Sequence, residues 1–349
     1  MRFEPRQSSP LWLIASAPVI AVLVALAICA VLILWAGQSP LNAYALLFKG
    51  ALGSRFAITE TLTRATPMIL TGMAAAIAFR AKLWNIGGEG QFYAGALMAT
   101  WLGTGAIVLP SVLMVPFLLL AGALAGGLLL LLAALLKNQL KVDEVVTTLL
   151  LNFVILLLVN YLLEGPIRDP MSLGWPQAAP IIDQGVLPKL LSRSRLHVGF
   201  IVALAAAVGV WLLMRFTVWG YEIRAVGYNV LATAFAGIAV KRTVVMTALI
   251  SGGLAGMAGV GEVAGTKGYL TLDLSPGFGY AGIAVAMLAA LHPLAVVASA
   301  IFLAAIYVGA DSMSRAVNVP TYIADVIVAT SVLAVLVSVM LTRFRLRWR

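Results

Sequence analysis

The fold is decided by one stretch of the chain, residues 90–136, which reads GQFYAGALMATWLGTGAIVLPSVLMVPFLLLAGALAGGLLLLLAALL and contains no Asp, Glu, Lys or Arg. An α-helix rises about 1.5 Å per residue, so roughly 20 apolar residues cross the hydrocarbon core of a bilayer. The stretch is therefore long enough for two crossings, and Leu109, Pro110 and Ser111 mark the break between them. It predicts an integral membrane protein.

The whole chain has the composition of a membrane protein. Of its 349 residues, 62% are hydrophobic and only 10% are charged, whereas a soluble domain carries about 25% charged residues. These values exclude a soluble globular enzyme. Cys29 is the one cysteine, and His197 and His292 lie far apart in the sequence, so no disulfide framework and no metal site is expected. No catalytic triad stands out either, and we expect no enzyme activity and no cofactor.

The gaps between charged residues predict an all-α protein with ten membrane-spanning helices. The first apolar run follows Arg2 and Arg6 and is too long for a cleavable signal peptide, so it is interpreted as an uncleaved span. The predicted spans lie at residues 18–36, 58–79, two within 90–136, 145–163, 196–214, 243–261, two within 274–310, and 326–342. Together they predict a single transmembrane domain over residues 1–349.

The net charge of +10 comes from 23 Lys and Arg against 13 Asp and Glu. In a membrane protein the positive-inside rule explains this excess better than nucleic-acid binding does. With an even number of spans and both termini in the cytoplasm, 14 basic residues lie inside and 9 outside. The external loop, about residues 164–197, is rich in proline and is interpreted as a lid, a docking surface or a linker. The inner basic residues are Arg2, Arg6, Arg80, Lys82, Lys137, Lys141, Arg215, Arg224, Lys241, Arg242, Arg343, Arg345, Arg347 and Arg349.

Two glycine-rich segments indicate an internal repeat. Residues 85–96 read NIGGEGQFYAGA and residues 274–284 read LSPGFGYAGIA, and each leads into apolar spans. The repeat halves, about 58–163 and 243–342, are predicted to be inverted relative to each other, with broken helices that line a pathway. The alternative is that the glycines only allow close helix packing, as is expected of Gly122-x-x-x-Gly126 and Gly252-x-x-x-Gly256.

The segment at about residues 217–242 is predicted to lie on the cytoplasmic side. Residues 220–229 read GYEIRAVGYN, and the small residues that follow favour a short helix, a turn at Gly227 and a second helix along the membrane surface. This segment resembles the ATPase-docking loop of permeases in the branched-chain amino acid, ribose and nucleoside class of ABC importers. The resemblance extends to residues 85–91, 143–152 and 252–282, and is greatest to the nucleoside and simple-sugar permeases.

The resemblance implies a permease subunit in the bacterial plasma membrane that moves nucleosides by alternating access. It also implies a cytoplasmic ABC ATPase, a second permease subunit and an extracytoplasmic substrate-binding protein as partners. The chain itself has no Gly-x-x-x-x-Gly-Lys-Ser/Thr phosphate loop, so ATP is expected to be hydrolysed in a separate subunit. The residues expected to couple to the ATPase are Glu222, Arg224, Ala225, Gly227 and Asn229; otherwise Glu222 and Arg224 are an ordinary solvated pair.

Polar and aromatic residues around the glycine-rich segments are candidates for the pathway. Glu89 either orders the turn at a helix N-terminus or contacts a polar substrate. Asn152 bonds either a neighbouring helix or a ribose hydroxyl, and Phe278 and Tyr280 either stack on a base or belong to the core. The candidates are Asn85, Glu89, Gln91, Asn152, Phe278 and Tyr280.

Other functions are kept open. Simple sugars such as ribose are the alternative substrate within the same class. A rival from another class is an ion-coupled carrier in which Glu89, Glu262 or Asp325 titrates, and a third is a structural subunit without a pathway. Lys267 lies between Glu262 and Asp273, so these residues form either a salt-bridged mouth or a solvated stretch.

Overall fold

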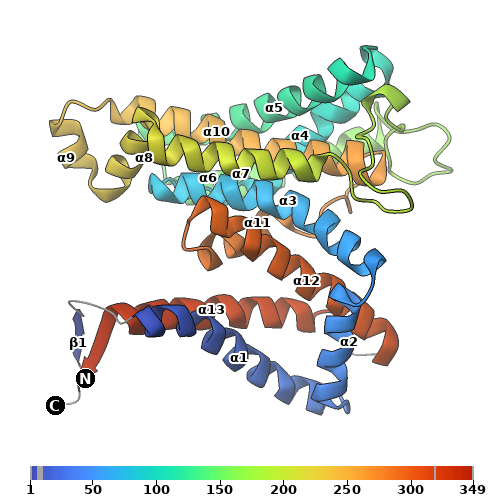
Figure 1. The fold of residues 1–349 in the computed structure, drawn as a ribbon. Coiled ribbons are helices and arrows are strands. Elements are labelled where there is room, and N and C mark those ends of the chain that lie inside the picture. Colours follow the sequence, from blue (N-terminus) through green and yellow to red (C-terminus); the bar gives the residue numbers. More distant parts are fainter. Residues whose placement is uncertain (1, 6–10, 318–319, 348–349) are drawn as a thin grey trace. The chain divides into compact units, whose positions relative to one another are not determined.

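The computed structural model describes residues 2–5, 11–317 and 320–347 (Figure 1). Regular structure in these ranges is almost entirely helical, which confirms the all-α prediction, and two short strands, β1 (Arg2–Pro5) and β2 (Phe344–Arg347), pair antiparallel. The helices are α1 (Leu11–Trp35), α2 (Pro40–Leu52), α3 (Arg55–Arg80), α4 (Gly88–Trp101), α5 (Ser111–Leu140), α6 (Glu144–Glu164), α7 (Gly199–Phe216), α8 (Val218–Tyr228), α9 (Val230–Phe235), α10 (Val240–Gly261), α11 (Phe278–Leu288), α12 (Pro293–Val317) and α13 (Ile323–Arg343). Shorter helical segments are the π-helices η1 (Leu102–Ala106) and η3 (Glu262–Lys267) and the 3₁₀-helix η2 (Asp183–Gly185).

Every predicted span coincides with a helix, but the helices differ in length. Six described helices are long and apolar enough to cross a membrane, and a pair bent by 114°, residues 23–35 with α2, would make a seventh. Helices α4 and α11 have 14 and 11 residues. At about 1.5 Å per residue α4 and α11 alone measure about 21 and 16 Å, less than a hydrocarbon core of about 30 Å, and η1 lengthens α4 only as far as the non-helical Gly105. Ten crossings therefore stay a prediction.

The chain divides into two compact units, one with the residues up to Thr61 and from Phe302 onward, the other with residues 62–301. In the first unit α1 packs along α13 (Figure 1). Cys29 is buried there, with its sulfur 3.7 Å from the hydroxyl oxygen of Thr330, as expected of a packing residue. The single transmembrane domain stays a prediction.

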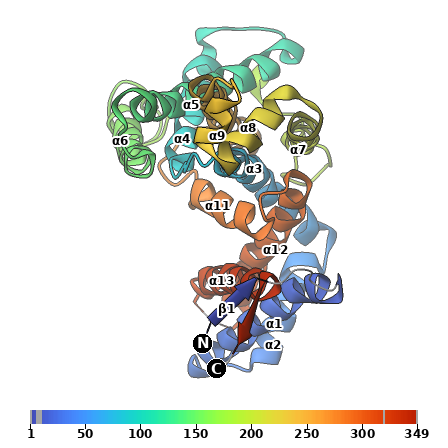
Figure 2. The ribbon, with the colours of Figure 1, turned by 90° about the vertical axis from the view of Figure 1, so that its left-hand side faces the viewer.

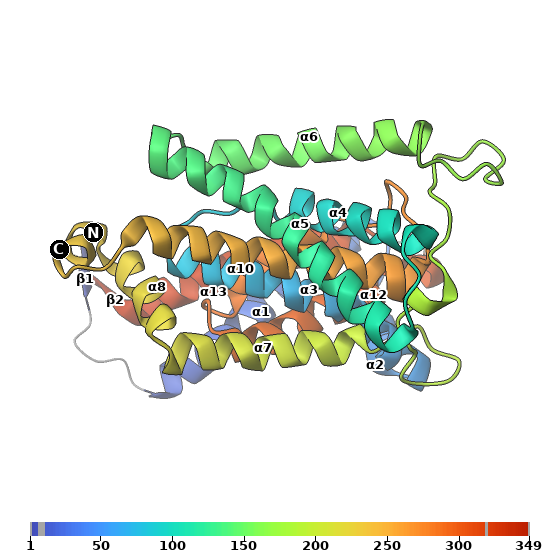
Figure 3. The same ribbon diagram turned by 90° about the horizontal axis from the view of Figure 1, so that it is seen from above.

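The second unit is built around α10, which packs against α5 and α4 (Figure 3). Glycines make this close approach possible. A Cβ atom on Gly126 would overlap the carbonyl oxygen of Gly252, and a Cβ on Gly252 would overlap that of Gly126. A Cβ on Gly256 would overlap the carbonyl oxygen of Gly122, and a Cβ on Gly95 would overlap that of Gly256. The packing role expected of the two Gly-x-x-x-Gly pairs is therefore confirmed, because only hydrogen atoms fit between these backbones.

The connection between α6 and α7 lies on the end of the second unit at which α10 continues into η3. The backbone N–H of Ala178 donates to the carbonyl oxygen of Leu270 (3.0 Å), and that of Leu187 donates to Ala264 (2.9 Å). Ala178 and Leu187 are fully or almost fully buried. Residues 164–197 thus pack on the helical core and are not a free linker.

We expect Gly126→Ala to lower the thermal unfolding midpoint of the purified chain in detergent. The added methyl group must push α5 away from α10, and overpacking of this kind costs about 1–3 kcal/mol. Gly209→Ala in α7 is the matched control, because no atom lies within 4 Å of its Cβ position and alanine favours a helix over glycine. Tryptophan fluorescence reports both midpoints; equal midpoints for the two variants would contradict the packing assignment.

Candidate functional site

The two glycine-rich segments meet inside the second unit, where α4 and α11 begin against each other. A Cβ atom on Gly88 would lie 3.2 Å from the carbonyl oxygen of Gly279, and a Cβ on Gly279 would overlap the backbone of Glu89. Gly88 is the first residue of α4 and Gly279 the second residue of α11, and the close approach of the two backbones leaves no room for a side chain on Gly279. The first amide groups of two short helices are therefore brought to one point.

Glu89 connects the two helix starts. It lies in the first turn of α4, only 4% exposed, and its Oε2 accepts a hydrogen bond of 2.7 Å from the backbone N–H of Gly279. The first N–H groups of a helix have no intrahelical acceptor and carry partial positive charge. Glu89 thus caps α11 from α4, and the turn-ordering role that the sequence indicated is present.

Asn85 and Gln91 form a reciprocal amide pair in front of α4. Asn85 Nδ2 donates to Gln91 Oε1 (2.9 Å), and Gln91 Nε2 donates back to Asn85 Oδ1 (2.8 Å). Asn85 Nδ2 also donates to the hydroxyl of Ser251 on α10, which in turn donates to the carbonyl oxygen of Ala74 on α3. These side chains are buried, and their bonds join the start of α4 to two long helices.

Asn152 reaches the same point from α6. Its Oδ1 accepts from the backbone N–H of Gly90 (2.8 Å), and its Nδ2 donates to the carbonyl oxygen of Ile86 (3.0 Å) and to the hydroxyl of Tyr280 (3.2 Å). The expected bond to a neighbouring segment is therefore present. The Tyr280 side chain links this group to α11 and is 42% exposed.

Phe278 belongs to the core and not to an open surface. It is 5% exposed, its ring centroid lies 6.1 Å from that of Phe92, and its carbonyl oxygen accepts from the hydroxyl of Thr71 (2.9 Å). Of the two predicted aromatics, only Tyr280 is accessible. The structure thus gathers the six candidate pathway residues around the starts of α4 and α11.

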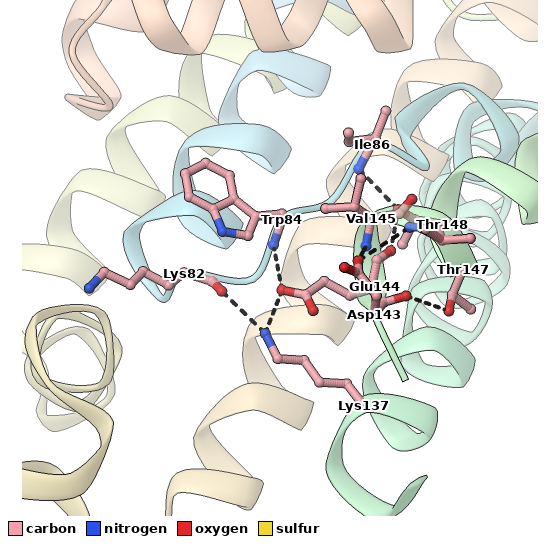
Figure 4. Close-up of polar contacts among 10 residues, drawn as sticks. Lys82, Trp84, Ile86, Lys137, Asp143, Glu144, Val145, Thr147 and Thr148 are labelled. Atoms are coloured by element: carbon pink, nitrogen blue, oxygen red, sulfur yellow. Dashed lines mark hydrogen bonds and ion pairs between the residues drawn. The ribbon is translucent and has the colours of Figure 1, made fainter. Parts of the chain in front are cut away.

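A second polar cluster holds the connection between α3 and α4 in place (Figure 4). Lys137 at the end of α5 pairs with Glu144 in the first turn of α6, with 2.5 Å between Nζ and Oε1, and also donates to the carbonyl oxygen of Lys82 (3.3 Å). Glu144 accepts from the backbone N–H of Trp84 as well (3.4 Å), and the hydroxyl of Thr148 accepts from Ile86.

Sequence reasoning singled out neither Glu144 nor Ser251 nor Thr71 as site residues. Glu144 was visible beside Asp143, which caps α6 by accepting from the backbone N–H of Val145 (2.7 Å). Its distance of seven residues from Lys137 spans the turn between two helices, and that spacing was the available signal. Ser251 and Thr71 lie within apolar helices and gave none.

The predicted coupling segment forms two helices, α8 and α9, at one end of the long helices of the second unit (Figures 1 and 2). The turn lies at Asn229 and not at the predicted Gly227. Asn229 has extended backbone angles, and its Oδ1 caps α9 by accepting from the N–H of Ala232 (3.0 Å). Gly227 lies within α8. A Cβ atom at this position would overlap the carbonyl oxygen of Arg80. Its glycine serves close packing against the end of α3.

The other coupling candidates lie along α8. Glu222 accepts from the hydroxyl of Thr243 on α10 (3.2 Å), Arg224 lines a pocket, and Ala225 is half-buried. Missed by sequence reasoning is the exposed apolar surface of α9, on which Leu231 is 82% and Phe235 is 97% exposed. Large apolar side chains on a six-residue helix were the signal for it.

Helix α8 is packed directly on the chain that leads to the site. Val226 belongs to one buried cluster with Phe79 and Leu83, and Leu83 precedes Asn85 by two residues. A displacement of α8 therefore acts on the connection that carries the amide pair.

The acids flanking Lys267 differ from one another. Lys267 Nζ lies 3.0 Å from Asp273 Oδ2, so the salt-bridged arrangement is confirmed for this pair. Glu262 is 5% exposed and lies within the extension of α10. Asp325 lies in the first turn of α13, as expected, where its carboxylate interacts favourably with the helix dipole.

Comparisons with known proteins give the class of the chain. The family model described as "Branched-chain amino acid transport system / permease component" matches residues 57–341. The chain is 36% identical over 91% of its length to the guanosine ABC transporter permease protein NupP of Bacillus subtilis, covering 92% of that protein. It is 34% identical over 99% of its length to the glucose ABC transporter permease protein TsgB13 of Haloferax volcanii, covering 93%. It is 29% identical over 89% to the nucleoside ABC transporter permease protein NupB of Lactococcus lactis, covering 88%. No solved structure matches the chain significantly.

We expect Asn152→Ala to destabilise the chain by about 1–3 kcal/mol, because the buried N–H of Gly90 and the carbonyl oxygen of Ile86 lose their partner. Asn160→Ala on the same helix is the control, since Asn160 is half-exposed. Chemical denaturation of both variants in detergent measures the difference. If Asn152→Ala unfolds at the same midpoint as Asn160→Ala, the three bonds of Asn152 do not hold the site together.

Proposed function

We propose a transport function from one premise: the chain belongs to the family of permease components of branched-chain amino acid transport systems. It is the membrane-embedded permease subunit of an ABC importer and moves nucleosides inward, with ATP hydrolysed in a separate cytoplasmic subunit. The observation that supports the proposal is the convergence of the starts of two short apolar helices, α4 and α11, on Glu89. Short, interrupted helices of this kind mark substrate sites in transporters.

Nucleosides are the preferred substrate class. Two of the relatives are named for guanosine or nucleosides, and they match the chain over about nine-tenths of its length. Tyr280 is half-exposed at the site, and an aromatic face suits stacking on a flat base. Simple sugars are the second candidate, and the Haloferax volcanii relative named for glucose favours them.

Ten crossings and cytoplasmic termini belong to the same proposal. The antiparallel pairing of β1 with β2 supports an even number of crossings, because it brings the first and last described residues of the chain together, with Arg2 opposite Arg347. The positive-inside rule then assigns this side to the cytoplasm of the bacterial cell. The order of α3 to α6, a long helix, a short helix and two long ones, recurs in α10 to α13 and supports the inverted repeat.

The cytoplasmic ATPase docks on the surface formed by α8 and α9. The side chains of Tyr228, Leu231 and Phe235 are exposed. They support an apolar contact with a partner, because exposing a group of large apolar side chains to water is unfavourable. Motion of α8 is transmitted through Gly227, which touches the end of α3, and through Val226 to Leu83. The second permease subunit is a paralogue of this chain, and an extracytoplasmic binding protein delivers the substrate.

The function is tested in proteoliposomes that contain the chain with its second permease subunit, ATPase and binding protein. We expect guanosine uptake that requires internal ATP and survives collapse of the proton gradient with an uncoupler, because the energy enters through the ATPase. Excess glucose in the same assay decides between the two substrate classes. Uptake that continues without ATP and stops with the uncoupler would show an ion-coupled carrier instead.

We expect Leu231→Ala with Phe235→Ala to weaken capture of the ATPase by the purified permease at least about tenfold, because buried apolar anchors dominate docking energies. The control is Leu173→Ala, which removes a side chain that is 99% exposed on the loop between α6 and α7. Both proteins should insert into the membrane normally. Unchanged capture by the double variant would exclude α9 as the docking surface.

A further inference from the structure

A basic pocket lies at the end of the second unit that carries α8. It has a volume of about 180 Å³, roughly the space of six water molecules. Its walls combine four basic side chains with apolar ones: Arg80, Arg215, Arg224, His292, Trp211 and Met214. A space of this size accommodates a phosphate group.

The three arginines of this pocket have no acidic partner among the described residues. Arg80 Nε donates to the carbonyl oxygen of Leu291 (3.3 Å), and the guanidinium of Arg215 lies 5.7 Å from the ring centroid of Phe216. The ion pairs within the described ranges involve other residues. The acid nearest in sequence, Glu222, instead accepts from Thr243. The positive charges of the pocket are thus left without a counter-charge.

The partial charges at the neighbouring helix ends offset only part of this positive charge. Helices α3 and α7 end beside the pocket, and each contributes about −0.5 charge, whereas α12 begins there at Pro293 and contributes about +0.5. With three guanidinium groups the sum is about +2.5 before any charge on His292. The free N–H groups of the first turn of α12 add donors for an anion.

We propose that this pocket binds a phosphate group, and that the phosphate is the headgroup of an anionic phospholipid. The neighbouring span α7 supports the lipid source, because it is only 28% buried and its side chains at Leu212 and Phe216 are 45% and 67% exposed. Trp211 and Met214 form an apolar wall suited to the glycerol and first acyl carbons. Basic pockets between spans at the cytoplasmic side bind acidic lipid headgroups in other membrane proteins.

The bound lipid anchors α8 to the bundle, because Arg224 lies on α8 while Arg80 and Arg215 lie on α3 and α7. One phosphate can thus bridge three helices around the proposed coupling surface. The proposed lipid site rests on the pocket alone and does not depend on which solute the permease moves.

The test is native mass spectrometry of the delipidated full chain in detergent, titrated with phosphatidylglycerol. Arg215→Gln with Arg224→Gln should bind the lipid about 30-fold more weakly, which corresponds to about fivefold for each lost charge. Lys241→Gln with Arg242→Gln is the matched control, because it removes the same charge from exposed residues at the start of α10. Its affinity should stay within about threefold of the unaltered chain.

Two further arms separate the sources of the phosphate. Phosphatidylcholine should bind weakly to all three proteins. Inorganic phosphate at 10 mM should not displace phosphatidylglycerol; displacement, together with phosphate-induced thermal stabilisation that the pocket variant loses, would assign the site to free phosphate. Equal lipid affinity of the pocket and control variants, or an equal loss in both, would overturn the proposal. Should the double variant fail to fold, Arg215→Gln alone, at an exposed position, answers the same question.

Discussion

The hydrogen bond from the Gly279 backbone to the Glu89 carboxylate is the contact on which the second unit depends. Lipid offers no partner to a backbone amide, so a helix that begins inside a membrane needs an acceptor from the protein. Glu89 supplies that acceptor for α11 while it lies in the first turn of α4. One buried carboxylate therefore stabilises two helix starts, and the surrounding glycines, amides and hydroxyls follow from the need to bring those starts together.

The positions of the helices could be predicted from the sequence because charge is excluded from the hydrocarbon over long runs, and those runs were visible. Their lengths could not. The uncharged stretch 90–136 indicates two crossings, but nothing in its composition reveals that α4 passes into η1 after Trp101 or that Gly105 turns the chain with φ of 108°. Helix ends within an apolar run depend on tertiary partners, such as the loop that packs on this region, and not on local hydropathy.

The candidate site was predictable to the extent that polar residues are rare in membrane spans. Asn152 stood out for that reason, Asn85, Glu89 and Gln91 stood out within a glycine-rich segment, and the structure brings the four together. Ser251 was invisible, because a serine within an apolar helix also occurs wherever its hydroxyl bonds its own backbone. The misplaced turn at Gly227 has a similar cause: a glycine marks either a turn or a close approach, and only the carbonyl of Arg80 decides which.

The polar groups at the site are largely committed to one another, and this bears on how a permease of this kind opens. Asn152 makes three bonds to other segments and Asn85 and Gln91 satisfy each other, so a solute can gain these partners only where an internal bond is broken. Breaking them in a buried setting is costly. In the proposed mechanism this energy comes from the ATPase through α8, whose Gly227 and Val226 pack on residues 79–83 at the start of the segment that carries Asn85. The proposed permease is thus a gate that its partner subunit moves.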